Sequence, residues 1–387
     1  MKAELAHASH DETGAGATAR KDHSTGILPS QALRALIDGG EIRSDRPIED
    51  HQIQPASLDL RLGAVAHRVQ SSFLPGRGAT VKERIAPLCM HSFDLEGGAV
   101  LEKGCVYIVE LAESLALRKR TSGFANPKSS TGRLDIFTRL ITDHGTEFDR
   151  VPAGYEGPLY IEISPRTFSI LVRAGARLNQ LRVKRGSPQY SDREQRQLQA
   201  AASLVDADLV DADIKGGVPL TVDLDGDPES GLVGYRARQH AGLIDLDKID
   251  HYYPLEFWEP VRARPGGGLI LDPADFYILA SKESVKVPLD YAAEMVAYDT
   301  LVGEFRVHYA GFFDPGFGHS EAGGEGTRAV LEVRSHEVPF LIEHGQTVGR
   351  LMYERLTAVP DRVYGMGIGS SYQRQGLALS KHFKRHP

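Results

Sequence analysis

The sequence predicts a mainly β protein with two related domains and few short helices. Short apolar runs such as VYIVEL and PLYIEI alternate with polar residues and are broken by Gly and Pro, which is typical of β-sandwiches and barrels. In addition, VYIVELAESLAL (106–117) resembles FYILASKESVKV (276–287), 170 residues further on. The same offset returns where 160–181 matches 330–351. A sustained offset of this kind indicates a duplicated domain.

The elements follow from local signals along the chain. Residues 1–25 are polar and aperiodic, which predicts a flexible tail. Ser30 can cap a helix that ends at Gly39-Gly40, and QPASLDLRLG (54–63) alternates like a strand. We therefore divide the chain into a first repeat, a charged linker that is compatible with a helix over REQRQLQAAASL, a second repeat and a Gly/Ser/basic C-terminal tail. Their ranges are 26–185, 186–216, 217–356 and 357–387.

Composition excludes several functional classes. The 387 residues carry a net charge of −7, which argues against a broad nucleic-acid-binding surface. The two cysteines, Cys89 and Cys105, cannot form a disulfide framework or a multi-cysteine zinc site. No long apolar run and no positive-then-apolar leader is present, so we expect a cytoplasmic protein.

The segment PKSSTGRL (127–134) is the first candidate site. Lys128 precedes two hydroxyls, Ser129 and Ser130, and Arg133 follows three residues after the second. Hydroxyls and backbone N–H groups suit phosphate oxygens, so the segment can form a compact polar pocket. A surface turn with a helix cap would have the same sequence, and the pattern alone favours that interpretation.

The second candidate is a hairpin that leads to a glutamate, and it occurs in both repeats. In the first, Asp149 precedes a Gly/Pro turn and a strand with Glu162; in the second, Asp314 precedes a strand with Glu332. A carboxylate inside an apolar strand is costly unless it is paired or neutralised. Burial raises its pKa toward the range of a general base. An outward-facing Glu on an alternating strand is the alternative.

The third candidate is the C-terminal segment VYGMGIGSSYQRQG (363–376). A Gly-rich segment that carries Tyr364, Tyr372 and Gln375 can fold over a ligand and exclude water. A disordered C-terminus is the alternative. The zinc-deaminase signature, H-x-E followed by P-C-x-x-C, is absent from the sequence, so we expect no protein-bound metal.

Taken together, these motifs resemble the dCTP deaminases, relatives of the trimeric dUTPases, over roughly residues 27–376, and most closely their double-length bacterial branch. The motif S-S-x-x-R is matched by Ser129, Ser130 and Arg133. The Asp-Pro-Gly-aromatic hairpin before a Leu-Glu strand is matched from Asp314 to Glu332, and the tail motif by Tyr372 and Gln375. The resemblance implies two dUTPase-like distorted β-barrel or sandwich domains.

The resemblance also implies a reaction. Glu332 or Glu162 would take a proton from a water that attacks C4 of cytosine, giving dUTP and ammonia without zinc. Ser129 and Arg133 would lie near this water and the nucleotide, with Lys128 and Ser130 also binding substrate. Asp149 or Asp314 would hold the deoxyribose 3′-hydroxyl. Tyr364, Tyr372 and Gln375 would reach the triphosphate, which arrives with Mg²⁺, although Ser371 stands where relatives tend to have Lys.

The two repeats differ in a way that suggests a shared site. The second repeat has AYDTLVGEF (297–305) in place of SSTGR. Single-copy relatives are homotrimers with sites between subunits, so we expect a homo-oligomer. Our hypothesis is a composite site, with Ser129 and Arg133 from the first repeat, and Asp314, Glu332 and the C-terminal tail from the second. The alternative keeps Glu162 as the base. A dUTP diphosphatase, a bifunctional deaminase that also releases pyrophosphate, and a non-catalytic nucleotide sensor remain as other functions.

Overall fold

The computed structural model describes residues 22–187, 191–206, 213–297, 305–307, 311–335, 338–365 and 376–385. Tyr372 and Gln375 lie outside these ranges. Strands are the main regular structure of the described residues, which confirms the predicted mainly β class, and most strands pair within their own repeat. Within the described ranges, no helix is long and apolar enough to cross a membrane.

The first repeat contains two larger sheets and a small one. The 5-stranded sheet has the order β1-β13-β8-β10 with β3 on β13, the 6-stranded sheet β5-β4-β7-β11-β9 with β2 on β7, and the third β16-β12-β6. The strands are β1 (Gly26–Ile27), β2 (Ile42–Ser44), β3 (Leu58–Leu60), β4 (Leu62–Val69), β5 (Cys89–Asp94), β6 (Ala99–Leu101), β7 (Val106–Ala116), β8 (Thr121–Pro127), β9 (Ile136–Thr142), β10 (Arg150–Val151), β11 (Glu156–Pro165), β12 (Ile170–Val172) and β13 (Asn179–Arg185).

The second repeat has the same kinds of sheets. Their orders are β14-β25-β20-β22, β17-β15-β19-β23-β21 and β18-β24. The strands are β14 (Val218–Thr221), β15 (Leu232–Ala237), β16 (Ile244–Asp245), β17 (Trp258–Arg262), β18 (Gly268–Leu271), β19 (Phe276–Val285), β20 (Tyr291–Ala297), β21 (Phe305–Val307), β22 (Phe312–Phe313), β23 (Thr327–Ser335), β24 (Phe340–Glu343) and β25 (Thr347–Arg355). One strand crosses over: β16 pairs with β12 of the first repeat.

Strand register repeats at the offset found in the sequence. Glu162 of β11 lies opposite Ile108, and Glu332 of β23 lies opposite Ile278. Ile170 lies opposite Leu101 in the first repeat, and Phe340 opposite Leu271 in the second. Because a one-residue slip would turn every side chain to the other face, these matched registers give Glu162 and Glu332 equivalent positions in their sheets.

The helices are short and lie at the edges of the sheets. They are α1 (Ser30–Asp38), α2 (Val81–Leu88), α3 (Ser129–Gly132), α4 (Asp192–Ala202) and α5 (Pro254–Phe257), with 3₁₀ turns at Asp50–Gln52 and Ser320–Ala322. The predicted cap at Ser30 is wrong. Pro29 is the N-cap of α1, and the buried Ser30 hydroxyl donates instead to the Asp361 carboxylate. The structure prefers this long-range partner because Ser30 is turned inward.

The segment predicted as a linker is attached to the second repeat. Its Ser191 caps α4, where its hydroxyl accepts the Glu194 N–H and the Glu194 carboxylate accepts the Ser191 N–H. Buried Gln195 donates to the Tyr353 carbonyl at 2.9 Å and accepts the Tyr353 N–H at 3.3 Å. A polar helix therefore docks on β25 by pairing with its backbone, which periodicity does not reveal.

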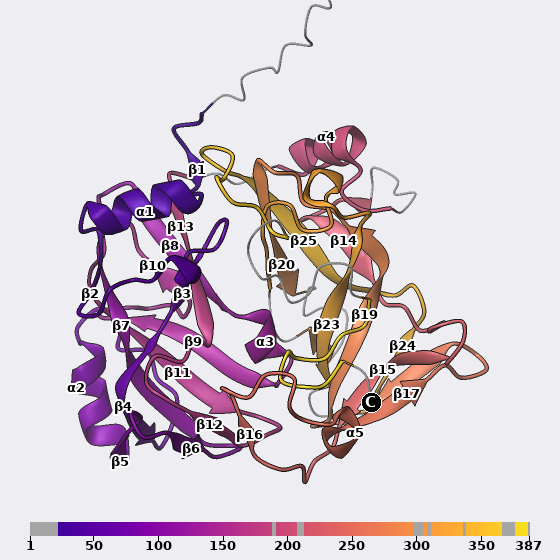
Figure 1. Cartoon of the computed structure of the whole chain (residues 1–387), viewed down its shortest axis with the longest axis horizontal. Helices are drawn as coiled ribbons and strands as arrows, with labels where there is room; N and C mark the ends of the chain where they lie inside the picture. Colours follow the sequence, from indigo (N-terminus) through magenta and orange to yellow (C-terminus); the bar gives the residue numbers. More distant parts are fainter. Residues whose placement is uncertain are drawn as a thin grey trace, which may run out of the picture.

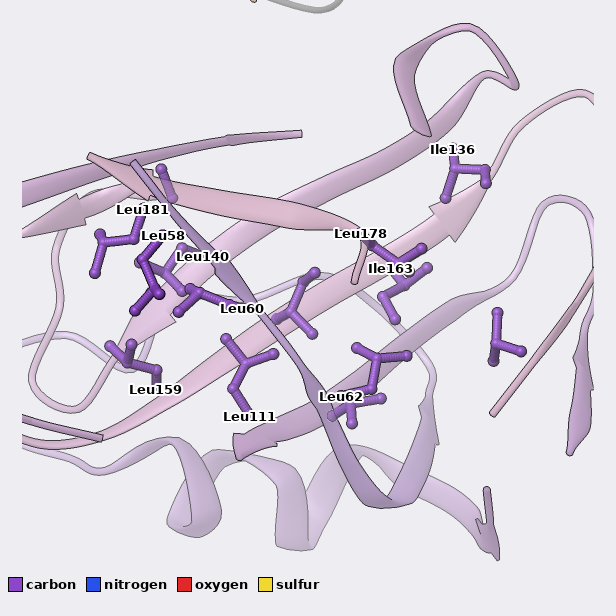
Figure 2. Packing of buried hydrophobic residues seen from close by; sticks show 14 of the residues in the cluster. Leu58, Leu60, Leu62, Leu111, Ile136, Leu140, Leu159, Ile163, Leu178 and Leu181 are labelled. Carbon is purple, nitrogen blue, oxygen red and sulfur yellow. The ribbon is translucent and has the colours of Figure 1, made fainter. Parts of the chain in front are cut away.

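The core of the first repeat is filled by aliphatic side chains from facing strands. Figure 2 shows Leu58 and Leu60 of β3 gathered with Leu140 of β9, Leu159 of β11 and Leu181 of β13. All five are fully buried. The alternation in QPASLDLRLG therefore places its leucines in the core, as the strand prediction requires.

The two repeats share one hydrophobic core at their boundary. Trp258 is fully buried. Its ring centroid lies 5.5 Å from that of Phe168 in the first repeat and 5.9 Å from that of Phe383 near the C-terminus. In Figure 1 the first repeat (indigo to magenta) lies on the left, the second (orange to yellow) on the right, and α3 between them. The motif PKSSTGRL therefore sits where the halves meet.

Candidate active site

The short helix α3 carries the polar motif of the first repeat. The Gly132 N–H donates to the Lys128 carbonyl at 2.9 Å, and the Arg133 N–H to the Ser129 carbonyl at 3.0 Å. This single turn follows β8 and precedes β9, so its residues project beyond the end of the sheet. Ser130 and Arg133 are buried, at 8% and 7% exposure. The motif forms a packed turn rather than a solvated surface loop.

A pocket of about 720 Å³ opens between α3 and the second repeat. Six of its lining residues are site residues predicted from the sequence: Lys128, Ser129, Arg133, Asp314, Glu332 and Tyr364. Ser130 faces a different cavity on the other side of α3. The structure thus brings Ser129 and Arg133 of the first repeat to the same pocket as Asp314 and Glu332 of the second, as the composite hypothesis requires.

Glu332 is a buried carboxylate on β23 that faces Arg133. The carboxylate Oε1 lies 4.0 Å from Arg133 Nε, and both side chains are less than 10% exposed. Burial raises the pKa of Glu332 to about 7, and the Arg133 charge opposes this rise. A carboxyl group with this pKa exchanges a proton readily near neutral pH, which suits a general base.

Asp314 follows β22 and is held from the first repeat. Arg182 of β13 donates through Nη2 to Asp314 Oδ1 at 3.3 Å, and through Nη1 to the Ala293 carbonyl at 3.0 Å. Its guanidinium also lies 4.0 Å from the Phe312 ring centroid. Burial raises the pKa of Asp314, and the Arg182 charge opposes this. Arg182 itself is fully buried, so it belongs to the scaffold behind the pocket.

The C-terminal segment contacts the pocket both before and after residues 366–375, which the structure does not describe. The Tyr364 N–H donates to the Pro315 carbonyl at 2.9 Å, and its ring lies 5.5 Å from Phe317. Gly376 lines the same pocket, and the Ala378 carbonyl accepts from Arg133 Nη1 at 3.1 Å. The predicted closing residues Tyr372 and Gln375 fall between these two contacts in sequence, outside the described residues.

Glu162 and Asp149 lie away from this pocket. Arg139 of β9 donates to Glu162 Oε1 through Nη2 at 2.6 Å and Nε at 3.1 Å. The Arg139 guanidinium also stacks on Phe148, 3.6 Å from its ring centroid. Asp149 accepts the Leu140 N–H at 2.7 Å, and burial raises its pKa to about 7. The first-repeat glutamate is therefore engaged by an in-sheet arginine, whereas Glu332 faces an open pocket.

Two contributors were missed by the sequence analysis. Arg182 lies between Leu181 and Val183 in the buried part of β13, and the register places Met352 at the matching position of β25. Asp59 lies in the run LDL, is 1% exposed and accepts from Lys128 Nζ. A charged residue inside a buried strand was the available signal, but its partner could not be read from local sequence.

One group in the described part of the chain could hold a metal ion. Asp223, Asp225 and His344 lie within 4.8 Å of one another, outside the pocket. Asp223 already accepts from Arg328, and the Leu224 N–H donates to His344 Nδ1 at 3.2 Å. These atoms are therefore used within the protein, and the group gives no reason to assign a metal to the reaction.

The mainly β fold, with a polar pocket between its two halves, defines a class of β proteins in which two domains share one site. The chain belongs to the 2′-deoxycytidine 5′-triphosphate deaminase family: the N-terminal domain of that family matches residues 24–187 and its C-terminal domain residues 191–383. Together the two matches cover all the residues that line the pocket.

Individual relatives agree with this assignment. The chain is 56% identical to a crystal structure of 2′-deoxycytidine 5′-triphosphate deaminase from Agrobacterium tumefaciens, with a TM-score of 0.82 over 86% of this chain and 100% of that one. It is 33% identical over 133 residues (33% of this chain) to the "dCTP deaminase, dUMP-forming" of Halobacterium salinarum. A protein of the same name from Streptomyces coelicolor is 28% identical over 192 residues, 46% of this chain. The chain spans 61% of the Halobacterium relative, less than two thirds, and 94% of the Streptomyces one.

Proposed function

We propose that this chain deaminates dCTP at the composite pocket, with Glu332 as the general base. The observation that carries the proposal is the buried Glu332 carboxylate, with a pKa of about 7, facing Arg133 across the boundary between the repeats. Family membership and the relatives' names support dCTP as the substrate.

The reaction needs one base that first accepts and then returns a proton. Ionised Glu332 takes a proton from water and passes it to N3 while the resulting hydroxide attacks C4 of cytosine. Glu332 then takes the proton of the new C4 hydroxyl and delivers it to the amino group, so the C4–N bond breaks and ammonia leaves as the C4 carbonyl forms. A base whose pKa lies near the working pH serves both steps. Arg133, 4.0 Å away, stabilises the ionised form of Glu332.

The remaining pocket residues would bind the rest of the nucleotide. Asp314 is held by Arg182 beside the pocket, which suits a carboxylate that accepts from the deoxyribose 3′-hydroxyl. Lys128 and Ser129 line the pocket and supply an ammonium group and a hydroxyl for phosphate oxygens, whereas Ser130 lines the cavity on the other side of α3 and is not part of this set. The triphosphate would arrive with Mg²⁺ as part of the substrate, and Tyr364, Tyr372 and Gln375 would close over it.

The environment of Glu162 makes it a poor alternative base. Two nitrogens of Arg139 bond to Glu162 Oε1, and the same guanidinium is stacked on Phe148 and bonded to Ser72 Oγ at 2.6 Å. Protonating Glu162 during turnover would weaken a buried ion pair. It also lies outside the pocket that contains Ser129 and Arg133.

The test compares the two glutamates directly. We expect Glu332→Gln to lower kcat roughly 10²- to 10⁴-fold, the usual contribution of a general base. Glu162→Gln should retain kcat within a few-fold. Each protein is incubated with dCTP and Mg²⁺ in the presence of a zinc chelator, and products are separated by anion exchange. Full turnover by Glu332→Gln together with loss in Glu162→Gln would reject the composite site.

The product distinguishes two candidate activities. The simplest product is dUTP with ammonia. The relatives named dUMP-forming favour a second candidate, in which pyrophosphate is also released. The same chromatogram separates dUTP from dUMP. A chain that leaves dCTP intact but cleaves dUTP would be a dUTP diphosphatase, and a chain that binds nucleotide without any turnover would be a sensor.

Assembly and location are further parts of the proposal. We infer a homo-oligomer from the resemblance to the single-copy trimers, and the cytoplasm stays the location that we propose. Sedimentation of the purified chain tests the oligomer, and a monomer at assay concentration would contradict it.

A further inference from the structure

A second ion pair lies directly beside Glu332 and Arg133 at the boundary between the repeats. Arg334 of β23 follows Glu332 by two residues, and Asp135 follows Arg133 by two residues. Arg334 Nη2 donates to Asp135 Oδ2 across the boundary. Each of the two segments therefore carries one positive and one negative side chain, and the two pairs have opposite polarity.

The pair formed by Asp135 and Arg334 is closed by direct hydrogen bonds. Asp135 is 1% exposed, and Thr167 Oγ1 donates to its Oδ2 at 2.5 Å. Arg334 Nη2 also donates to Thr167 Oγ1 at 3.0 Å, and its Nη1 donates to the Ala274 carbonyl. A buried and hydrogen-bonded ion pair of this kind resists separation, because each charge would be left desolvated without its partner.

The turn that ends α3 fixes the backbone of Asp135. The Asp135 N–H donates to the Gly132 carbonyl at 2.8 Å, and the Arg166 N–H donates to the Asp135 carbonyl at 2.9 Å. Asp135 has φ +56°, in the left-handed region that Asn and Asp enter more readily than most other residues. Since these bonds leave the turn little freedom, holding Asp135 also holds the backbone from which Arg133 projects.

The strand β23 has the same effect on the other side of the boundary. Glu332 and Arg334 lie about 7 Å apart along an extended strand, and their side chains point to the same face of the sheet. Both positions are paired with β19, at Ile278 and Phe276. Fixing Arg334 therefore fixes the backbone of Glu332 as well. The ion pair thus sets the separation between the backbones that carry Glu332 and Arg133.

This separation keeps an arginine from bonding directly to the glutamate. Opposite charges in a buried site attract strongly, so an arginine that is free to move closes on a carboxylate. Arg139 does so with Glu162, at 2.6 Å. Arg133 Nε instead stays 4.0 Å from Glu332 Oε1, and its Nη1 donates to the Ala378 carbonyl at 3.1 Å.

The first repeat carries no cation at the position of Arg334. By the 170-residue offset, Ser164 stands there, two residues after Glu162. The sheet therefore forms without a charge at this position. The cation accompanies the glutamate that faces the pocket, and it is missing beside the glutamate that is bonded to an arginine.

We propose that Asp135 and Arg334 are positioning residues that hold Arg133 away from direct contact with Glu332, so that the Glu332 carboxylate stays available to take up a proton. The inference rests on the proposed function and deepens it. Neither Asp135 nor Arg334 lines the pocket, so both act through Arg133 and Glu332 rather than on the nucleotide.

The first test follows the Glu332 carboxyl group itself by infrared spectroscopy of the full chain as a function of pH. Its C=O band in the protonated form is identified as the band that is absent from Glu332→Gln. The variants are Asp135→Asn, which suits the left-handed backbone, Arg334→Gln and the double variant. We expect the pKa of Glu332 to fall in all three by about one unit or more, because Arg133 then bonds to the ionised carboxylate.

The direction of the shift separates positioning from a simple charge effect. Loss of the Asp135 charge by itself lowers the pKa of Glu332, whereas loss of the Arg334 charge by itself raises it. A fall in both single variants and in the double variant therefore reports the movement of Arg133. Opposite shifts in the two single variants, or an unchanged pKa in the double variant, would overturn the inference. The other charged residues that line the pocket stay in place in every variant: Lys128, Arg133, Asp314 and Arg328.

Two further variants control for a general loss of packing. Asp245→Asn removes a carboxylate from another ion pair between the repeats, in which Arg173 Nη1 lies 2.8 Å from Asp245 Oδ1. It should leave the pKa of Glu332 unchanged. Arg334→Lys keeps the charge and a donor, and it should restore most of the original pKa. Thermal unfolding of each variant verifies that it is folded.

Turnover of dCTP by the same proteins separates this inference from the proposed function. We expect kcat to fall roughly 10- to 100-fold in Asp135→Asn and Arg334→Gln, as a small misplacement of a catalytic group does, with KM within a few-fold. If the pKa falls in these variants while Glu332→Gln retains turnover, the positioning is correct and the proposed base is wrong. If Glu332→Gln loses turnover while the variants keep the original pKa and kcat, the base is correct and the positioning is wrong.

Discussion

At the scale of single residues, Glu162 and Glu332 occupy equivalent positions but have different surroundings. Both are buried on the central strands of their sheets. Arg139 bonds directly to Glu162, whereas Arg133 stays 4.0 Å from Glu332 and leaves it beside a pocket. The contrast arises from neighbours on other elements, Arg139 on β9 and Arg133 after α3, so strand position alone does not define a general base.

The raised pKa of Glu332 predicts opposite pH effects on activity and stability. The base must be ionised, so kcat should fall as pH drops below about 7. Between its ordinary value of 4.5 and about 7, the folded chain binds this proton more tightly than the unfolded chain, so the Glu332 contribution to stability is lost as pH rises. At pH 8, Glu332→Gln should therefore be more stable by up to about 3 kcal/mol.

Chemical denaturation of both proteins at pH 5 and pH 8 checks this expectation. The gain from Glu332→Gln should be small at pH 5, where the folded chain already holds the proton, and larger at pH 8. A gain that is the same at both pH values would show that desolvation of the carboxylate is not its cause.

Arg182 offers a second test at this scale. The matching position in the second repeat is Met352, so Arg182→Met introduces the residue that β25 carries at the equivalent register position. It leaves buried Asp314 without the guanidinium that donates to it, and we expect the free energy of unfolding to fall by about 3–5 kcal/mol. Urea denaturation at pH 7 measures this. The double variant with Asp314→Asn should recover part of the loss, and a single variant as stable as the parent would contradict the assignment.

At the scale of elements, the hairpin between β22 and β23 sets the position of Asp314 relative to Glu332. Gly318 lies in it with φ +63°, and a Cβ there would stand 2.1 Å from the Val285 carbonyl oxygen. The chain therefore packs against the end of β19 more closely than any side chain allows. This contact determines the path by which the hairpin enters β23.

Gly318→Ala is expected to cost more than 2 kcal/mol of unfolding free energy, because it adds a backbone clash to the strain of a left-handed conformation. Gly345→Ala is the control. Gly345 has φ +77° with open space around its Cβ position, so only the conformational strain of about 1 kcal/mol remains. Denaturation of both variants measures the difference. Equal losses would mean that the hairpin can shift without cost.

At the scale of the whole molecule, the repeats are joined through a common core rather than a flexible linker. Ile27 bridges to Leu356, and the Thr357 N–H donates to the Ile27 carbonyl at 2.9 Å. The strand β16 adds to β12 of the other repeat. These contacts fix α3 against β23, and the geometry of the composite pocket depends on them.

A shared core predicts a single unfolding transition. The chain has one tryptophan, Trp258, which is buried among aromatic rings of both repeats, so its fluorescence should follow the loss of both. We expect calorimetry and fluorescence to report the same midpoint. Trp258→Ala should lower that midpoint without splitting it, at a cost of about 3–5 kcal/mol. Two separate calorimetric transitions would contradict the shared core.

The sequence by itself determined the class of fold and six of the sixteen residues that line the pocket, Arg133, Asp314 and Glu332 among them. Strand periodicity is a property of neighbouring residues, and the 170-residue offset is found by comparing two sequence segments. Both can therefore be recognised without the tertiary structure. The motifs at Ser129–Arg133 and Asp314–Glu332 were visible for the same reason. The family assignment followed from their joint order.

Only the tertiary structure decided which groups meet. The approach of Arg133 to Glu332, the hold of Arg182 on Asp314 and the cluster around Asp59 join residues that are far apart in sequence. The same holds for Ser30, whose hydroxyl bonds to Asp361 instead of capping α1. Local propensity carries no information on these partners, because they meet only when distant parts of the chain pack together. That packing buries Glu332 and Asp314, which raises their pKa values, and it also brings the arginines that oppose the rise.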